Sequence, residues 1–305
     1  MKRGVRALLI LVVAAFTGCL CITAESMSTE RKIVIGGKNF TEQYLLPQMA
    51  KELLEKAGFL VKLKTGLATN LVRKALELGE IDFYYEYTGT AYTVFYKQRD
   101  PAIMNNSKKV YEWVRNQDKK KGLIWLDPVQ FNNTYTLMMK NSNARKKGIR
   151  SISDLANYVN KHPKDLIFGI GTEFWERPDG FKKLMKVYSF RVPAEMIKKM
   201  SIGLAYTALK NGQIGVGMGF ATDGRIAAFG FVNLVDDKKF FPIYNPAPVV
   251  RAEVLEKYPE IQKILKPLAD NLNTIEMQKM NKSVDVDHES EEKVARDWLK
   301  KKGLL

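Results

Sequence analysis

The chain has 305 residues, of which 46% are hydrophobic, and carries a formal net charge of +16. Its length and apolar content suffice for a large core, as one domain or two lobes, and no disulfide can hold that core because Cys19 and Cys21 both lie near the N-terminus. The basic residues are scattered as pairs and triplets with acids nearby, which argues against a nucleic-acid-binding face and favours a basic protein beside an anionic membrane surface.

The N-terminal segment has the pattern of a secretory signal. Three basic residues precede a short apolar run at 7–16, and small residues lead to a cysteine in "FTGC" (16–19). This end resembles the lipobox of bacterial lipoproteins, which implies cleavage before Cys19 and its lipidation; simple secretion is the alternative. We therefore expect a signal peptide at 1–18 and a lipid-anchored linker at 19–30.

The first part of the remaining chain alternates between strand and helix patterns. We expect strands at 32–37, 60–66 and 81–85, with helices at 41–58 and 68–80 between them. Two strand–helix units that lead into a third strand predict a parallel sheet covered by helices.

The alternation continues after a helical pattern at 107–122. The further elements expected are strands at 135–140, 166–170 and 214–220, helices near 152–160, 180–188 and 203–212, and an amphipathic helical tail at 258–282 and 289–303. These elements predict an α/β protein, and two α/β lobes on one chain would leave a cleft between them in which a ligand binds.

The stretch "DFYYEYTGTAYT" (82–93) permits two interpretations. Phe83, Tyr84 and Tyr85 run consecutively, so they face both sides of a strand, and Gly89 then interrupts the pattern as a turn would. The stretch is either a core strand followed by a turn or one wall of a binding site. We expect Tyr84 and Tyr85 themselves to pack in the core.

Catalytic residues are hard to find in this sequence. Its only histidines are His162 and His288, both in hydrophilic surroundings without metal-ligand spacing, so both are expected to be exposed. "GGKNF" (36–40) lacks the spacing of a phosphate-binding loop, and "GVGMGF" (215–220) lies inside a strand pattern. We predict no cofactor, no metal and no enzymatic activity.

Six motifs occur in one order along the chain and together resemble a known family. They are "GGKNFTEQYLLPQMAKELLEKAG", "LATNLVRKALELGEIDFYYEYTGT", "FNNTYTLMM", "ERPDG", "LAYTALKNGQI" and "ATDGRI". The chain from about 31 to 304 thereby resembles the substrate-binding proteins of osmoprotectant ABC importers, which capture glycine betaine, choline, carnitine or proline betaine.

The resemblance implies a periplasmic-binding-protein fold of the second type. The expected lobes are 31–134 with 244–305 (lobe I) and 135–243 (lobe II), joined by two crossovers and closing on ligand like a hinge. The implied function is extracytoplasmic capture of a quaternary-ammonium osmoprotectant, with glycine betaine favoured, and delivery to the transmembrane subunits of an ABC permease. Choline, carnitine, ergothioneine or a polar amino acid are alternative ligands, and an extracytoplasmic enzyme or a structural surface lipoprotein is an alternative of another class.

The resemblance also implies the residues that would hold the cation. A quaternary ammonium group donates no hydrogen bond, so aromatic ring faces recognise its charge. The matching positions here are Tyr87, Tyr135 and Tyr244, together with Phe220, which keeps the ring but lacks the hydroxyl that relatives often carry there.

For a ligand carboxylate the resemblance implies Lys38, Thr90 and Arg177, because cations and hydroxyls bind such a group. Two of these residues have alternative roles. Lys38 follows Gly37 and could be a solvated turn residue, while Arg177 could pair with Glu176 or Asp179.

Four polar residues near these motifs are interpreted as structural. Asn39 and Glu42 resemble a helix cap at the start of the helix at 41–58. Asp223 and Arg225 of "TDGRI" are expected to hold a crossover together.

Overall fold

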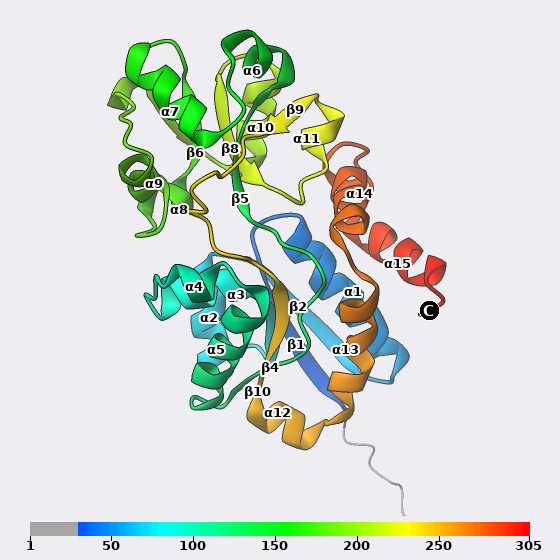
Figure 1. Ribbon diagram of the computed structural model, residues 1–305. Coiled ribbons are helices and arrows are strands. Elements are labelled where there is room, and N and C mark those ends of the chain that lie inside the picture. Colours follow the sequence, from blue (N-terminus) through cyan, green and yellow to red (C-terminus); the bar gives the residue numbers. More distant parts are fainter. Residues whose placement is uncertain (1–29) are drawn as a thin grey trace, which may run out of the picture. The chain divides into compact units, whose positions relative to one another are not determined.

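The computed structural model describes residues 30–305, in which helices and strands alternate as in α/β proteins (Figure 1). The strands are β1 Lys32–Lys38, β2 Leu60–Leu67, β3 Phe83–Tyr87, β4 Leu123–Trp125, β5 Tyr135–Lys140, β6 Phe168–Gly171, β7 Ile197–Met200, β8 Val216–Phe220, β9 Phe231–Asn233 and β10 Pro246–Arg251. The helices are α1 Glu42–Lys56, α2 Thr69–Glu77, α3 Thr88–Thr90, α4 Pro101–Met104, α5 Ser107–Lys119, α6 Asn141–Lys147, α7 Ile152–Lys161, α8 Thr172–Glu176, α9 Phe181–Val187, α10 Ile202–Lys210, α11 Arg225–Ala228, α12 Ala252–Lys257, α13 Glu260–Asn271, α14 Thr274–Asp285 and α15 Glu291–Lys301. A π-helical turn at Ala91–Phe95 and a 3₁₀ turn at Ala194–Met196 complete the elements.

Within residues 30–305 the strands form two five-stranded sheets. The first sheet has the order β2-β1-β3-β10-β4. β1 runs parallel to β2 and β3, which confirms the parallel arrangement predicted for the first strands. The prediction missed β10, a strand from the C-terminal part of the chain that lies antiparallel between β3 and β4.

The second sheet has the order β7-β6-β8-β5-β9 and takes all its strands from one continuous stretch, 135–233. β6 pairs in parallel with β7 and β8, whereas β5 is antiparallel to β8 and β9. Both sheets are therefore mixed, and the α/β class predicted from the sequence is confirmed.

Two segments connect the sheets, one from β4 to β5 and one from β9 to β10, and they are hydrogen-bonded to each other. The Asn133 amide donates to Tyr244 O (3.0 Å), and the Tyr244 amide donates to Asn132 Oδ1 (2.8 Å). A third link comes from α14, because Asn281 Nδ2 donates to Thr222 O (2.9 Å) beyond β8. The predicted bounds of lobes I and II stay a prediction.

Separate apolar clusters cover the two faces of the first sheet. On one face α1, α13 and α15 bury side chains such as Leu46 and Trp298 against Ile35. On the other face, α2 and α5 pack against Tyr84 and Trp125. The predicted core positions of Tyr84 and Tyr85 are confirmed, since both are fully buried.

The helical tail predicted at 258–282 consists of two helices, because α13 ends at Asn271 and the side chain of Asn273 caps α14 by accepting from the Glu276 amide (3.0 Å). One local prediction is wrong: Gly89 is not in a turn that follows the strand but lies in α3, which leads into the π-helical turn.

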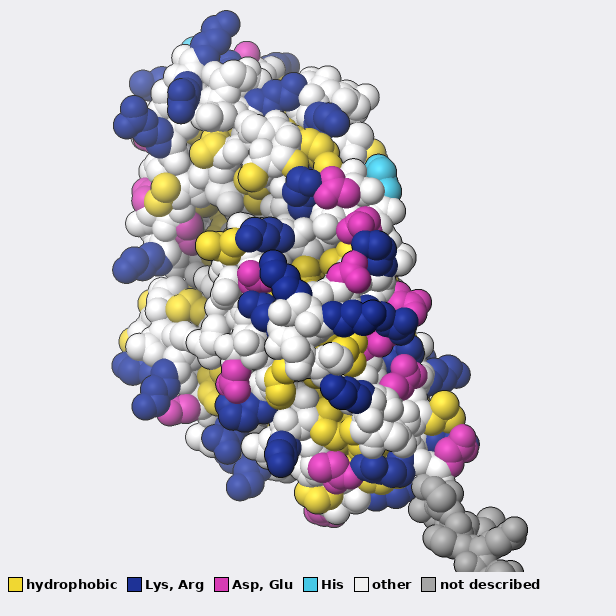
Figure 2. Space-filling model, turned by 90° about the vertical axis from the view of Figure 1, so that its right-hand side faces the viewer, with side chains coloured by type: hydrophobic (Ala, Val, Ile, Leu, Met, Phe, Trp, Pro, Cys, Tyr) yellow, Lys and Arg dark blue, Asp and Glu magenta, His cyan; other side chains and the backbone are white. Residues whose placement is uncertain are grey.

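The surface carries its charges intermixed. On the face shown in Figure 2, Lys and Arg side chains lie among Asp and Glu side chains, as the scattered sequence pattern predicted. Lys293 of α15, for example, lies 2.8 Å from both Glu289 and Asp297. Within residues 30–305 no helix combines the length and the apolar character required to cross a bilayer. The predicted signal peptide, Cys19 and the linker fall before the described residues, except Glu30.

Gly89 is required by close packing. A Cβ atom at this position would lie 2.8 Å from Ile243 O and 2.8 Å from Tyr244 Cδ1, both on the second connecting segment. Only a hydrogen atom fits there, so Gly89 lets the ring of Tyr244 lie directly against α3.

We expect Gly89→Ala to lower the free energy of unfolding by about 1–3 kcal/mol, because the added methyl group must displace Tyr244 or the backbone. Urea unfolding measures the change. Gly203→Ala is the matched control: its Cβ would come no closer than 3.6 Å to a neighbour and would lie in α10, where alanine is favourable. Equal effects of the two substitutions would contradict the packing argument.

Candidate functional site

A cavity of about 530 Å³ lies between the carboxyl-terminal ends of strands from both sheets. Its lining includes every residue to which a ligand contact was assigned from the sequence: Lys38, Tyr87, Thr90, Tyr135, Arg177, Phe220 and Tyr244. The structure brings these seven residues together from segments that are up to about two hundred positions apart in the sequence, from Lys38 to Tyr244. Their individual roles toward a ligand stay predictions.

The aromatic side chains of the cavity form a connected group. The centroid of the Tyr135 ring lies 5.2 Å from that of Phe220 and 5.5 Å from that of Tyr244. Phe40 continues the group, at 5.0 Å from Phe220 and 6.1 Å from Tyr87. Sequence reasoning did not predict Phe40 as a cavity residue, although it ends the motif "GGKNF".

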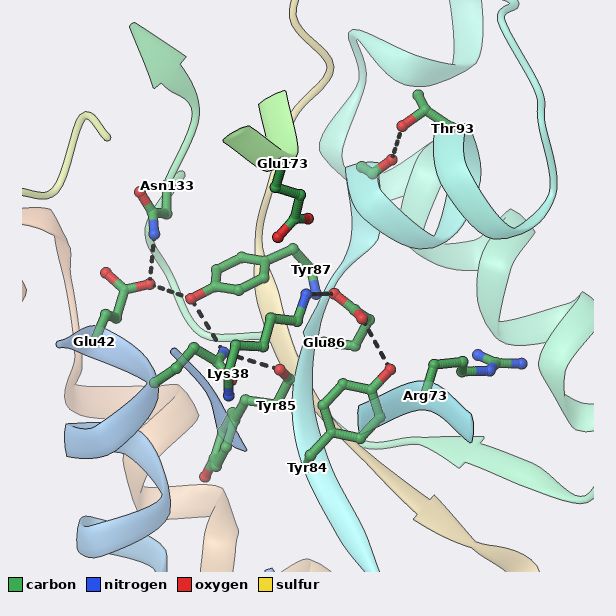
Figure 3. A network of polar contacts seen from close by, with 12 residues as sticks. Lys38, Glu42, Arg73, Tyr84, Tyr85, Glu86, Tyr87, Thr93, Asn133 and Glu173 are labelled. Atoms are coloured by element: carbon green, nitrogen blue, oxygen red, sulfur yellow. Dashed lines mark hydrogen bonds and ion pairs between the residues drawn. The ribbon is translucent and has the colours of Figure 1, made fainter. Parts of the chain in front are cut away.

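Lys38 is buried at the end of β1, which excludes the solvated turn that was its alternative role. Its Nζ lies 2.6 Å from Glu86 Oε1 of β3, and both side chains are almost inaccessible to solvent. Tyr84 donates to the other oxygen of Glu86 (2.8 Å), so that this carboxylate is bound on both sides (Figure 3). Lys38 Nζ also lies 5.1 Å from the ring centroid of Tyr87.

Arg177 is bound to Asp179 by two hydrogen bonds, of 2.9 and 2.8 Å, which is one of the two pairings considered from the sequence. Its Nη1 donates to the hydroxyl oxygen of Tyr135 (3.0 Å), and its guanidinium carbon lies 5.2 Å from the centroid of that ring. Burial alone would raise the pKa of Asp179, but hydrogen bonds from Arg177 and Thr93, with the Arg177 charge, hold that pKa below its usual value.

Glu42 is a cavity residue, and its predicted role in a helix cap is wrong. The helix begins after Thr41, no side chain caps it, and the Glu42 carboxyl is 2% exposed. Oε1 accepts from the Tyr87 hydroxyl (2.6 Å) and from Asn133 Nδ2 (2.9 Å) (Figure 3). Oε2 accepts from the Thr222 hydroxyl (2.7 Å). Asn39, the other predicted capping residue, is exposed at the cavity rim.

Burial raises the pKa of Glu42 from 4.5 to about 7, because the hydrogen bonds from Tyr87, Thr222, Asn133 and Asn281 recover only part of the lost hydration. Sequence reasoning could not find this residue. A glutamate in the first turn of a helix is common for electrostatic reasons alone, and its burial depends on segments distant in the chain.

Asp223 and Arg225, which were expected to hold a crossover together, form an ion pair with each other, with Nη2 at 2.5 Å from Oδ2. Arg225 Nη2 also lies 3.2 Å from Asp285 Oδ2 at the end of α14, and Thr41 donates to the other oxygen of Asp285 (2.7 Å). This group of charges therefore connects the segment after β8 with the C-terminal helices and with the start of α1.

Neither histidine lines the cavity. His162 and His288 are exposed, as predicted. In the part of the chain from residue 30 onward, no three His, Cys, Asp or Glu residues are arranged to hold a metal ion.

Comparison with known proteins places this chain in a family. Residues 31–301 match the family model OpuAC, described as the substrate binding domain of ABC-type glycine betaine transport systems. The chain belongs to this family. It is a substrate-binding component of the kind that serves ABC transporters, as the resemblance of its motifs implied.

Relatives of this chain agree with the family. A glycine-betaine-binding protein of Pseudomonas aeruginosa is 37% identical over 100% of this chain and 96% of its own length. The ergothioneine transport permease/binding protein EgtU of Helicobacter pylori is 36% identical over 90% of this chain, which spans about half (48%) of that protein. Relatives named in this way are transport proteins rather than enzymes.

The fold has solved counterparts. A crystal structure of a glycine betaine/carnitine/choline ABC transporter protein superposes with a TM-score of 0.73 at 30% identity, covering 89% of this chain and 99% of that chain. The predicted periplasmic-binding-protein fold of the second type is thereby confirmed.

The raised pKa of Glu42 predicts a pH-dependent stability. The folded state binds the proton more tightly than the unfolded state, so the contribution is complete below pH 4.5 and is lost as the pH rises through about 7. Over this window the loss amounts to on the order of 3 kcal/mol.

We expect Glu42→Gln to remove this loss, so the difference in unfolding free energy between variant and wild type should change between pH 4.5 and 7. Urea unfolding across that range measures it. For Glu176→Gln, an exposed position on α8, the curve should run parallel to that of the wild type. A Glu42→Gln curve that is also parallel would show that Glu42 titrates normally.

Proposed function

We propose that this protein is an extracytoplasmic solute-binding protein that captures a quaternary-ammonium solute and delivers it to an ABC permease without chemical change. The observation that carries the proposal is a connected group of rings at one cavity of a member of this family: Phe40, Tyr87, Tyr135, Phe220 and Tyr244. The names of relatives support the ligand class, since they include glycine betaine, carnitine and ergothioneine.

The charges of the cavity suit a cationic head group. Ring faces attract a quaternary ammonium ion because their π electrons carry partial negative charge. Two of these rings already have a protein cation close by, Lys38 at Tyr87 and Arg177 at Tyr135. Glu86 and Asp179 neutralise those two cations, so that a cationic ligand does not meet unpaired positive charge.

The proposed mechanism is closure of two lobes about their connecting segments. We propose lobe I at 31–134 with 244–305 and lobe II at 135–243, with the ligand bridging both and stabilising the closed state by its higher affinity for it. Lipidation of Cys19, which would hold the protein at a membrane close to its permease, is part of the same proposal.

Substitution of the rings tests the cage. Phe220→Leu, Tyr135→Leu and Tyr244→Leu keep apolar volume and remove the ring, so each should weaken choline and glycine betaine by about tenfold or more. Phe220→Tyr should be neutral or slightly favourable. Titration calorimetry gives the affinities, and Phe229→Leu, whose ring contacts Phe231 away from the cavity, is the control.

Two outcomes would contradict this proposal. If the wild type binds no quaternary amine, the ligand class is wrong. If the ring variants bind as tightly as the Phe229→Leu control, these rings are structural and another part of the protein holds the ligand.

The carboxylate contacts proposed for Lys38, Thr90 and Arg177 need a separate test. Alanine at Lys38 or Arg177 would leave Glu86 or Asp179 buried without its partner and so destabilise the fold. Thr90→Val and Arg177→Lys avoid this problem, because they remove a hydroxyl and a two-pronged donor while keeping shape or charge. Both should weaken glycine betaine more than choline, and equal losses in calorimetry would refute the assignment.

A further inference from the structure

Five side-chain donors at the Glu42 end of the cavity bind acceptors of the protein. The pairs are Tyr87 Oη, Asn133 Nδ2 and Thr222 Oγ1 to Glu42, Asn281 Nδ2 to Thr222 O, and Thr41 Oγ1 to Asp285 Oδ1. All these donors bind to acceptors of the protein itself.

Several acceptors at the same end have no donor. Among the described residues, Asn133 Oδ1, Asn281 Oδ1 and Asp285 Oδ2 are buried and lack a hydrogen-bond partner. Asn133 and Asn281 are 5% and 3% exposed, and all three residues line the cavity. Asp285 Oδ2 lies near Arg225, at 3.2 Å, without hydrogen-bond geometry. Buried acceptors are rarely left unpaired, because each costs free energy comparable to a lost hydrogen bond.

Rotating the side-chain amide groups of Asn133 and Asn281 does not give their oxygens a donor. Turning the side chain of Asn133 would point its oxygen at the Glu42 carboxyl, and turning that of Asn281 would point its oxygen at the carbonyl of Thr222. Both arrangements place two acceptors against each other. The observed orientation of both amide groups is therefore fixed. The two Oδ1 atoms point away from Glu42 and from the Thr222 carbonyl, which the Nδ2 atoms bind.

The charges at the Glu42 end of the cavity also favour a ligand that donates a hydrogen bond. Lys38, Arg177 and Arg225 are each in an ion pair with a carboxylate other than Glu42. In the described part of the chain no Lys or Arg lies within ion-pair distance of Glu42, which is held by neutral donors alone. Hydrogen bonds to an ionised carboxylate are among the stronger ones in proteins.

We propose that the Glu42 end of the cavity, with the acceptor oxygens of Asn133, Asn281 and Asp285, selects quaternary-ammonium solutes that carry a hydroxyl or N–H donor. The inference rests on the proposed function and narrows its ligand class. Glycine betaine has a quaternary nitrogen and a carboxylate but no donor, so it leaves these acceptors unpaired. A hydroxylated quaternary amine such as choline or carnitine supplies the missing donor.

The test compares pairs of ligands that differ in the donor. Choline and its O-methyl ether share the charge and the trimethylammonium group, and only choline has an O–H. Carnitine and glycine betaine make the same comparison among carboxylate ligands. Titration calorimetry is done on the full chain at about pH 8.5, above the pKa of Glu42. In each pair the ligand that carries the O–H group should bind about tenfold more tightly than the ligand without it.

Glu42→Gln and a control complete the design. The variant keeps the size of the side chain, removes the charge and adds an N–H donor, so the preference for choline over its methyl ether should fall to about twofold or less. Glu176→Gln, which changes an exposed glutamate outside the cavity, should keep the full preference. Tetramethylammonium, which has neither donor nor carboxylate, measures the loss of affinity that comes from removing the charge of Glu42 alone, and choline should lose more than that.

Each outcome decides the matter. Equal affinity for choline and its methyl ether in the wild type overturns the proposal, because water molecules then satisfy these acceptors, and this comparison stands even if Glu42→Gln does not fold. A glycine betaine affinity above that of carnitine overturns it as well. If no quaternary amine binds, tetramethylammonium included, the proposed function fails rather than the donor requirement.

Discussion

The carboxyl group of Glu42 connects, by hydrogen bonds, the separate segments that line the cavity. It accepts hydrogen bonds from the end of β3, from the first connecting segment and from the residues after β8, through Tyr87, Asn133 and Thr222. These segments belong to both sheets and to the connection between them. A single acidic side chain on α1 thus fixes where a ring of the first sheet lies relative to the second sheet, and the remaining rings are arranged around that position.

A second constraint is that positive charge near the rings is always neutralised. The guanidinium of Arg177 and the ammonium of Lys38 lie close to ring faces, where they would otherwise compete with a cationic solute. Buried carboxylates bind both of them at 2.6 to 2.9 Å. The burial of these ion pairs contributes little to stability by itself. In the proposed function its effect is electrostatic, because neutralised protein cations leave the aromatic surface available to a cationic ligand.

Sequence reasoning found what local patterns and ordered motifs can show. It gave the α/β class, the parallel strands β1 to β3, the buried Tyr84 and Tyr85, and a set of residues that line one cavity.

Sequence reasoning failed where contacts between distant segments determine the position of a strand or a side chain. It did not predict β10, which lies between β3 and β4 although it contains Pro246 and Pro248, and proline donates no backbone hydrogen bond and is rare in central strands. Glu42 looked like a capping residue, since nothing near it in the sequence shows that Thr222 and Asn133 enclose it.

The position of β10 has a consequence for the order of folding. The second sheet uses only residues 135–233, so its contacts are comparatively local and can form as soon as that stretch is available. The first sheet needs β10 between β3 and β4, and its core also needs Trp298 of the last helix. Long loops must close before those contacts form, which is slow. The half of the molecule made first is therefore completed last, and until the C-terminal segment arrives β3 exposes an unpaired edge to other chains.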